Sequence, residues 1–138
     1  MKVRILTPQK QLLDVANASE LFFPGESGTI AVLDEHAPLV TNIGIGVVIC
    51  TVGNISHFIK VSGGVAEVTN TSAVLLVDVG EESSEIDLER AKRALEKAEA
   101  RLASKDSSNI DLIRAQKAKD RAQARIEAVE LKNKHRSK

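Results

Sequence analysis

The segment Gly80-Glu-Glu-Ser-Ser-Glu-Ile-Asp-Leu-Glu-Arg-Ala91 separates two unlike halves of this 138-residue chain. Before it, short apolar and β-branched runs alternate with glycines, and after it alanine, lysine, arginine and glutamate continue with few helix breakers. Ser84 or Asp87 can cap the start of a helix, where the neighbouring acidic residues suit the helix dipole. The segment therefore predicts a β domain over residues 1–84 and a helical domain over residues 85–138.

Residues 1–84 contain short apolar runs that are separated by turn residues, and Ile55–Val61 alternates with a period of two. The glycine pairs at Gly44–Gly46 and Gly63–Gly64 are expected to end strands. This pattern predicts an all-β sandwich of about ten short strands. The expected strands include Val3–Thr7, Gln11–Val15, Ala18–Phe23, Thr29–Leu33, Leu39–Ile43, Val47–Val52, Ile55–Val61, Val65–Thr69 and Ala73–Val79.

Beyond the dividing segment the apolar period changes to about 3.5 residues, which indicates helix. The expected apolar seams are Leu88, Ala91, Leu95, Ala98 and Leu102 on a first helix, and Ala115, Ala118, Ala122 and Val129, with Ile126 beside them, on a second. The stretch Ala103–Asn109 is expected to be the turn, so the helices should form an antiparallel hairpin. With the turn centred near residue 106, Arg125 should lie opposite Asp87, and Arg121 opposite Ala91.

Formal charges cancel over the whole chain but are distributed unevenly. Residues 1–80 hold four Lys/Arg against seven Asp/Glu, whereas residues 114–138 hold nine against three. The basic second helix suits an acidic protein surface better than nucleic acid, because no aromatic residues are interleaved for base stacking. A merely solvated helix is the alternative. Cys50 lies in an apolar run and is expected to be a buried thiol in a reducing compartment.

No pattern in the sequence indicates an enzyme active site. Gly44-Ile45-Gly46 is not followed by a helix, as a dinucleotide-binding loop would be. The histidines His36, His57 and His135 lie far apart without metal-ligand spacing, so no metal site is expected. No stretch is apolar enough to span a bilayer, and the N-terminus resembles neither a signal peptide nor a transit peptide.

Three segments resemble the epsilon subunit of the F-type ATP synthase of the bacterial or plastid type. They are Gly28-Thr-Ile-Ala-Val-Leu-Asp-Glu-His-Ala-Pro-Leu-Val-Thr41, Gly63-Gly-Val-Ala-Glu-Val68 and Ile86-Asp-Leu-Glu-Arg-Ala91. The resemblance implies a non-catalytic rotor subunit of the central stalk, which couples proton-driven rotation to ATP synthesis. Its partners would be the gamma subunit and the c-ring. The location would be peripheral, on the cytoplasmic face of the bacterial inner membrane or the stromal side of the plastid thylakoid.

The resemblance also implies residue roles. The rotor-ring interface would consist of Glu26, Ser27, Glu35, His36, Ala37 and Pro38. The hairpin would extend toward the alpha and beta subunits and inhibit ATP hydrolysis. Its contacts with an acidic segment of beta would be Arg114, Lys117, Lys119, Arg121 and Arg125. A free-standing adaptor or chaperone-like module, whose helices bind clients, is the alternative function.

Residues 86–91 resemble a regulatory ATP-binding motif, Ile/Leu-Asp-x-x-Arg-Ala, which is found in several bacterial members of this family. By that resemblance Ile86, Asp87 and Ala91 would hold the base and sugar, with Glu81 nearby. Arg90, Arg121 and Arg125 would supply charge for the phosphates, and no other cofactor is expected. Lys97 departs from the pattern, because strongly binding members have a second arginine there, which implies weaker binding. An intramolecular Arg125–Asp87 salt bridge is the alternative explanation for an arginine in the helix seam.

Overall fold

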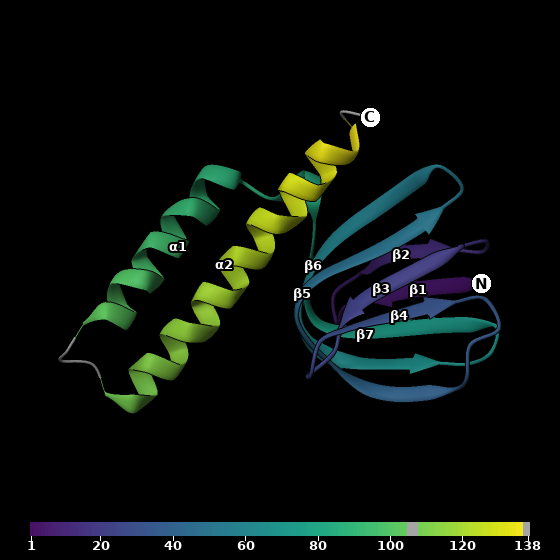
Figure 1. Cartoon of the computed structure of the whole chain (residues 1–138), viewed down its shortest axis with the longest axis horizontal. Helices are drawn as coiled ribbons and strands as arrows, with labels where there is room; N and C mark the ends of the chain where they lie inside the picture. Colours follow the sequence, from purple (N-terminus) through teal and green to yellow (C-terminus); the bar gives the residue numbers. More distant parts are fainter. Residues whose placement is uncertain (105–107, 137–138) are drawn as a thin grey trace.

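Seven strands and two long helices make up the fold over the part of the chain that this computed structural model describes, residues 1–104 and 108–136. The strands are β1 (Lys2–Leu6), β2 (Gln11–Val15), β3 (Glu20–Pro24), β4 (Thr29–Leu33), β5 (Leu39–Val52), β6 (Ile55–Val68) and β7 (Ser72–Glu82). A 3-10 turn, η1 (Ser83–Glu85), leads into α1 (Leu88–Ala103) and α2 (Asn109–Arg136). Figure 1 shows the hairpin on one side of the β domain.

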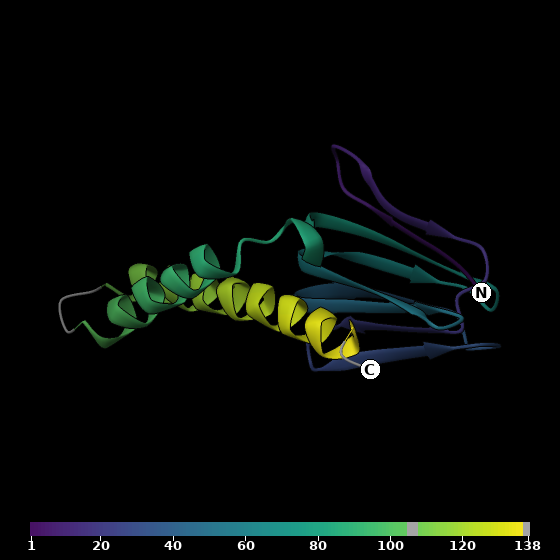
Figure 2. The ribbon, with the colours of Figure 1, turned by 90° about the horizontal axis from the view of Figure 1, so that it is seen from above.

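The strands form one hydrogen-bonded sheet in the order β2-β1-β7-β6-β5-β3-β4. All neighbours are antiparallel except β1 and β7, which are parallel. The sheet folds over on itself, so that its two halves form the layers of a sandwich (Figure 2). The all-β sandwich with a following helical hairpin, which the sequence predicted, is therefore confirmed.

The number of strands differs from the prediction, because two glycine pairs do not end strands. β5 and β6 are continuous over 14 residues each and pass through Gly44–Gly46 and Gly63–Gly64. Gly64 has a φ of +136°, and a Cβ there would lie 2.2 Å from the carbonyl oxygen of Leu76. Glycine lets a long strand bend where its backbone meets a neighbour closely, so what resembled a break in the sequence is a bend.

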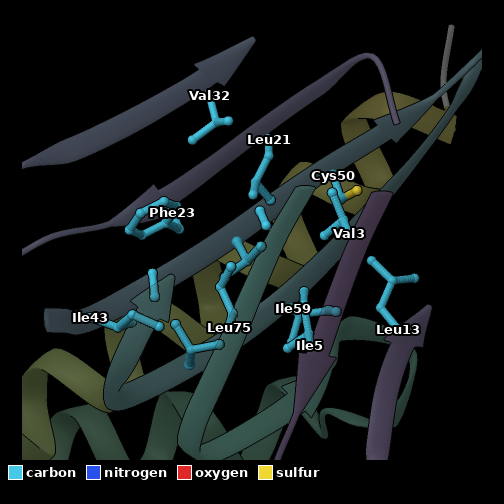
Figure 3. Close-up of a cluster of buried hydrophobic side chains, with 14 of the residues drawn as sticks. Val3, Ile5, Leu13, Leu21, Phe23, Val32, Ile43, Cys50, Ile59 and Leu75 are labelled. Carbon is cyan, nitrogen blue, oxygen red and sulfur yellow. The ribbon is translucent and has the colours of Figure 1, made fainter. Parts of the chain in front are cut away.

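The hydrophobic core lies entirely between the two layers of the sandwich. Its buried members come from all seven strands and the segment before β3, and none comes from the described residues of either helix. Figure 3 shows the largest of them, among them Phe23, Leu21, Ile5 and Leu75. Cys50 is fully buried in this cluster, and burial raises the pKa of its thiol to about 11. The β domain therefore has a core that does not depend on the hairpin.

Of the two predicted caps for the first helix, Ser84 and Asp87, the structure has Asp87, and Ser84 lies in η1. The side chain of Asp87 accepts a hydrogen bond from the backbone N–H of Arg90 at 3.1 Å, so Asp87 is the N-cap. At the second helix, the Ser108 hydroxyl accepts from the backbone N–H of Asp111. The predicted turn at 103–109, including its centre near residue 106, lies partly outside the described residues.

The hairpin touches the sandwich mainly through its second helix. α1 packs against α2, and α2 contacts β5, β6 and η1, whereas α1 has no extensive contact with a strand in the described ranges. Ala115 and Ala122 are buried as the seam predicted, but Ala124 and Ala128 are buried too. These two lie on the same side of the helix as His135, whose ring meets Phe58 of β6 edge-on at 5.8 Å. α2 thus has two buried faces.

No helix in the described ranges is both long enough and apolar enough to cross a membrane.

Candidate functional site: the cavity between sandwich and hairpin

A cavity of about 440 Å³ lies where the sandwich meets the hairpin. Its volume is within the range of small-molecule sites. β7 and η1 supply two acidic residues, the segment before α1 supplies two more residues, and both helices complete the wall. The lining residues are Glu81, Glu85, Ile86, Asp87, Arg90, Ala91, Ala94 and Arg125.

The cavity brings together most of the residues that the sequence singled out for nucleotide binding. Glu81, Ile86, Asp87, Arg90, Ala91 and Arg125 all line it. Arg121 is half-buried on α2, one turn before Arg125, and is not among the lining residues. Lys97 is exposed farther along α1 and does not line the cavity either. Glu85 and Ala94 line it without having been predicted.

The anionic partner of Arg125 is Glu81, not Asp87. The Nε of Arg125 donates a hydrogen bond to Oε1 of Glu81 at 2.9 Å. The Asp87 carboxylate instead caps α1. The alternative explanation, an Arg125–Asp87 salt bridge, is therefore wrong. A helix-capping carboxylate already has a backbone donor, while the end of β7 offers a carboxylate on the other side of Arg125.

Lys60 is a site residue that the sequence analysis missed. Its side chain is 0% exposed, and its Nζ lies 3.2 Å from Oε1 of Glu81, so one carboxylate oxygen contacts both Lys60 and Arg125. Lys60 and Glu81 are direct cross-strand partners on β6 and β7. The alternation of β6 puts Lys60 on the same face as Phe58, and α2 covers that face. The one feature of the sequence that could have indicated this site is a lysine among the mostly apolar residues of β6.

The electrostatics of this cluster favour an ionised carboxylate and disfavour a charged lysine. Burial raises the pKa of Glu81, but the hydrogen bond and charge of Arg125, together with Lys60, outweigh burial and hold it below the usual value. Burial lowers the pKa of Lys60, and the charges of Arg125 and Arg121 lower it further against the opposing effect of Glu81. The docked arrangement thus places Lys60 where its charge is costly.

The acidic groups at the cavity are already engaged, whereas one of its arginines is not. Glu85 forms a long ion pair with Lys10 at 3.7 Å, and Glu81 and Asp87 have the partners given above. No carboxylate within the described ranges lies within 4.0 Å of the Arg90 guanidinium or of Arg121. Among the described residues, Arg90 and Arg121 therefore have no carboxylate that neutralises their charge at close range.

The residues predicted for a rotor-ring interface lie in two separate loops. Glu26 and Ser27 lie in the β3–β4 loop beside a hollow of about 350 Å³, and the Glu26 carboxylate accepts from Asn42 at 2.9 Å. The loop with Glu35, His36, Ala37 and Pro38 follows β4, and Glu35 has a φ of +60°. The ring nitrogens of His36 are covered and have no partner among the described residues. Five-residue β4 separates the loops by about 16 Å.

The five basic residues predicted for inhibitory contacts do not share one environment. Arg114 and Lys117 are exposed on α2, and Lys119 is half-buried. Arg121 and Arg125 belong to the charged cluster at the sandwich, and both are half-buried there. Among the described residues there is no group of three or more His, Cys, Asp or Glu that could hold a metal ion.

Two family models match the chain in succession. The first, described as "ATP synthase, Delta/Epsilon chain, beta-sandwich domain", matches residues 1–83. The second, described as "ATP synthase, Delta/Epsilon chain, long alpha-helix domain", matches residues 84–130. Among similar curated proteins is the ATP synthase epsilon chain of Carboxydothermus hydrogenoformans, 41% identical over 107 residues, which are 76% of this chain and 78% of that protein. The epsilon chain of Desulforamulus reducens is 42% identical over 107 residues, 75% and 78% of the two chains.

Two solved structures share the fold at low identity. A chain in the cryo-EM structure of Euglena gracilis mitochondrial ATP synthase, OSCP/F1/c-ring in rotational state 1, has a TM-score of 0.78 at 20% identity, covering 88% of this chain and 76% of that one. A chain in the Tetrahymena thermophila mitochondrial ATP synthase central stalk/c-ring structure has a TM-score of 0.63 at 14% identity, covering 94% and 96%.

Proposed function

Because the chain belongs to the family of ATP synthase epsilon chains, we propose that it is a non-catalytic subunit of the central stalk whose hairpin restrains ATP hydrolysis. It takes part in coupling proton-driven rotation to ATP synthesis through contacts with the gamma subunit and the c-ring. It reaches the membrane only through the complex, on the cytoplasmic face in a bacterium or the stromal side in a plastid. A free-standing adaptor has no support from the family match.

One observation carries the proposed regulation: the hairpin is docked on a domain that has its own core. The core cluster contains no helical residue, and the buried residues of α1 and α2 are alanines. A buried methyl contributes only about 0.8 kcal/mol, so alanine seams hold a hairpin weakly. Most of the stability of a helix in a protein comes from the packing of its apolar face rather than from intrinsic propensity, and here that face is mostly alanine. The hairpin can therefore leave the sandwich without unfolding it, and extend along gamma toward alpha and beta.

The proposed contact with the c-ring includes both predicted loops, and β4 is the element that joins them. β4 is an edge strand of the sheet, with Leu33 53% exposed at the end that leads to the Glu35–Pro38 loop. An edge strand presents unpaired backbone groups and suits contact with another chain. A rotor-ring surface that contains Glu26, Ser27, Glu35, His36, Ala37 and Pro38 would have to run along this edge.

Photo-crosslinkers placed at positions 26 and 36 in the assembled synthase are expected to give adducts with c subunits. Both positions lie in loops at the ends of β4, so a ring that lies along this edge comes within reach of both. Mass spectrometry of the adducts identifies the partner, and a crosslinker at exposed Asn54, in the β5–β6 turn, is the control. Adducts with beta alone would contradict the rotor-ring assignment.

We further propose that the cavity binds ATP as a regulatory ligand. Six of the residues suggested by the family motif line one cavity of suitable volume, and Arg90 has no carboxylate partner among the described residues. Arg90 and Arg125 would contact the phosphates, and Ile86 and Ala91 the base and sugar side. Bound ATP favours the docked hairpin by RT ln(1 + [L]/Kd), about 2.7 kcal/mol at a hundredfold excess over Kd.

Calorimetric titration of the isolated protein with millimolar ATP is expected to show binding. Arg125→Ala should weaken it by about tenfold or more, because a charge-assisted hydrogen bond contributes roughly 1.5–3 kcal/mol. Arg121→Ala should weaken it less, since Arg121 does not line the cavity. Arg93→Ala, an exposed residue of α1 outside the cavity, is the matched control. If the wild type gives no binding heat with ATP and no change in its amide NMR shifts, the nucleotide site is contradicted. The role of Arg125 is then the ion pair with Glu81.

A further inference from the structure

Lys60 belongs to a cluster in which cations outnumber the carboxylate between them. Its ammonium and the Arg125 guanidinium share Oε1 of Glu81, and Arg121 is close enough to lower the Lys60 pKa. Within the described ranges Glu81 is the carboxylate that contacts Lys60 or Arg125. Burying the Lys60 ammonium costs solvation free energy. Because Lys60 shares Glu81 with Arg125, this contact does not fully offset that cost.

The burial of Lys60 depends on where α2 lies. Lys60 and Phe58 are on the same face of β6, and α2 covers that face, with His135 against the Phe58 ring. If α2 left the sandwich, this face of β6 would meet water. Phe58 favours docking, because docking buries an aromatic ring. Lys60 opposes docking, because the same movement removes water from its ammonium group.

We propose that Lys60 is a positioning residue that opposes docking of α2 on the sandwich, and that an anion bound in the adjacent cavity offsets this opposition. The ligand part of this inference rests on the proposed ATP site; the part that concerns Lys60 does not. An anion near Arg125 and Arg90 neutralises the surplus charge, and Glu81 is then left free to pair with Lys60. The hairpin would therefore dock weakly without a ligand and firmly with one.

Docking of α2 is expected to depend on pH through the Lys60 ammonium group. The pKa of Lys60 is lowered in the docked state, by burial first and then by Arg125 and Arg121 on α2, against the opposing effect of Glu81 on β7. On β5 the cross-strand neighbour is Val47, which does not titrate. The penalty on docking is complete below the lowered pKa and disappears as pH rises from there toward the ordinary lysine value. Docking should therefore strengthen as pH rises.

Amide hydrogen exchange of α2 in the isolated full-length protein tests the inference, because an undocked α2 loses protection. Lys60→Met keeps the length of the side chain and leaves Glu81 paired with Arg125. Without nucleotide, its α2 should exchange about tenfold more slowly than that of the wild type. Glu81→Gln leaves two cations without a carboxylate, and its α2 should exchange faster. Lys2→Met, an exposed lysine in a strand, is the control and should change nothing.

Two further arms complete the experiment. Lys60→Gln replaces Lys60→Met if the latter does not fold. Wild-type α2 should gain protection as the pH rises toward the ordinary lysine pKa of about 10.4, after correction for the intrinsic exchange rate. ATP and tripolyphosphate are the probes for the cavity, and each should slow exchange more in the wild type than in Lys60→Met.

The outcomes distinguish the two proposals. If Lys60→Met exchanges as fast as the wild type, or Lys2→Met slows exchange equally, the inference about Lys60 is overturned. Protection that does not change with pH also overturns it. If Lys60→Met slows exchange while neither probe binds the wild type, the role of Lys60 in docking is supported and the nucleotide site fails.

Discussion

Deletion of residues 87–138 is expected to increase ATP hydrolysis by the assembled synthase while the sandwich stays folded and the enzyme stays coupled. The core contains residues of the β domain only, so removal of the hairpin takes nothing from it. The main effect on stability is that the Phe58 ring is no longer buried under α2, which lowers the free energy of unfolding by about 2 kcal/mol if the ring becomes exposed. Solvation of Lys60 offsets part of that loss, because its burial is unfavourable in the docked state.

Circular dichroism and urea unfolding of the truncated protein, and hydrolysis by the reconstituted synthase, measure the two effects. A melting temperature lowered by roughly 10 °C with an intact β spectrum is the expected result, since 1 kcal/mol corresponds to about 4–8 °C for a domain of this size. If the truncated chain unfolds or does not assemble, the sandwich does not have a core of its own. If hydrolysis is unchanged, the hairpin does not inhibit.

Charge reversal of exposed basic residues on α2 complements the deletion, because it keeps the hairpin in place. Arg114→Glu with Lys117→Glu alters two exposed residues that lie away from the Glu81 cluster, so docking should not change. Inhibition should fall, and the remaining inhibition should weaken with salt, because exposed ion pairs contribute roughly 0.2–1 kcal/mol each and are screened. Lys92→Glu with Lys97→Glu, two exposed residues of α1, is the control. If inhibition changes neither with the charge reversal nor with salt, a contact between α2 and an acidic segment of beta is contradicted.

Gly64→Ala is expected to lower the free energy of unfolding of the sandwich by more than about 3 kcal/mol, because it combines backbone strain with a steric clash. Gly64 has a φ of +136°, and an added Cβ would lie 2.2 Å from the Leu76 carbonyl oxygen and 2.8 Å from Cα of Val77. Both atoms belong to the backbone of β7, which is held in the sheet and cannot move aside. The bend in β6 therefore requires glycine for two separate reasons.

Gly28→Ala separates the two reasons. Gly28 has a φ of +137°, almost the same as that of Gly64, but nothing lies within 4 Å of an added Cβ. Its loss of unfolding free energy should be only that of the strained backbone, about 1–3 kcal/mol. Urea unfolding of both variants measures the difference directly. If the two variants lost the same free energy of unfolding, the close packing of β6 against β7 at Gly64 would be contradicted.

Much of this protein could be predicted from sequence because the signals were local. The change from a period of two to a helical period placed the boundary between the halves, and Asp87 caps α1 as expected. Capping depends on residues within one turn, and a helical seam on residues within a few turns. Five residues around the joint lie close in sequence and line one cavity: Glu81, Ile86, Asp87, Arg90 and Ala91.

Other features were decided by contacts between distant segments. A glycine pair ends a strand or bends it according to the neighbouring strand, so Gly63–Gly64 were misread as a break. The alternation of β6 indicated which face Lys60 occupies but not that α2 would cover it. The alternative that paired Arg125 with Asp87 across the hairpin was wrong, because its partner Glu81 is 44 positions away at the end of β7.

The sequence by itself therefore determined the two kinds of secondary structure, the place where they meet and the residues of the joint, because neighbours along the chain decide those. Only the tertiary structure decided how β5 and β6 continue, that β4 lies at the edge of the sheet, and that Lys60, Glu81 and Arg125 form one cluster. Burial and ion pairing depend on what covers a side chain, and here the cover is a helix from the far end of the chain.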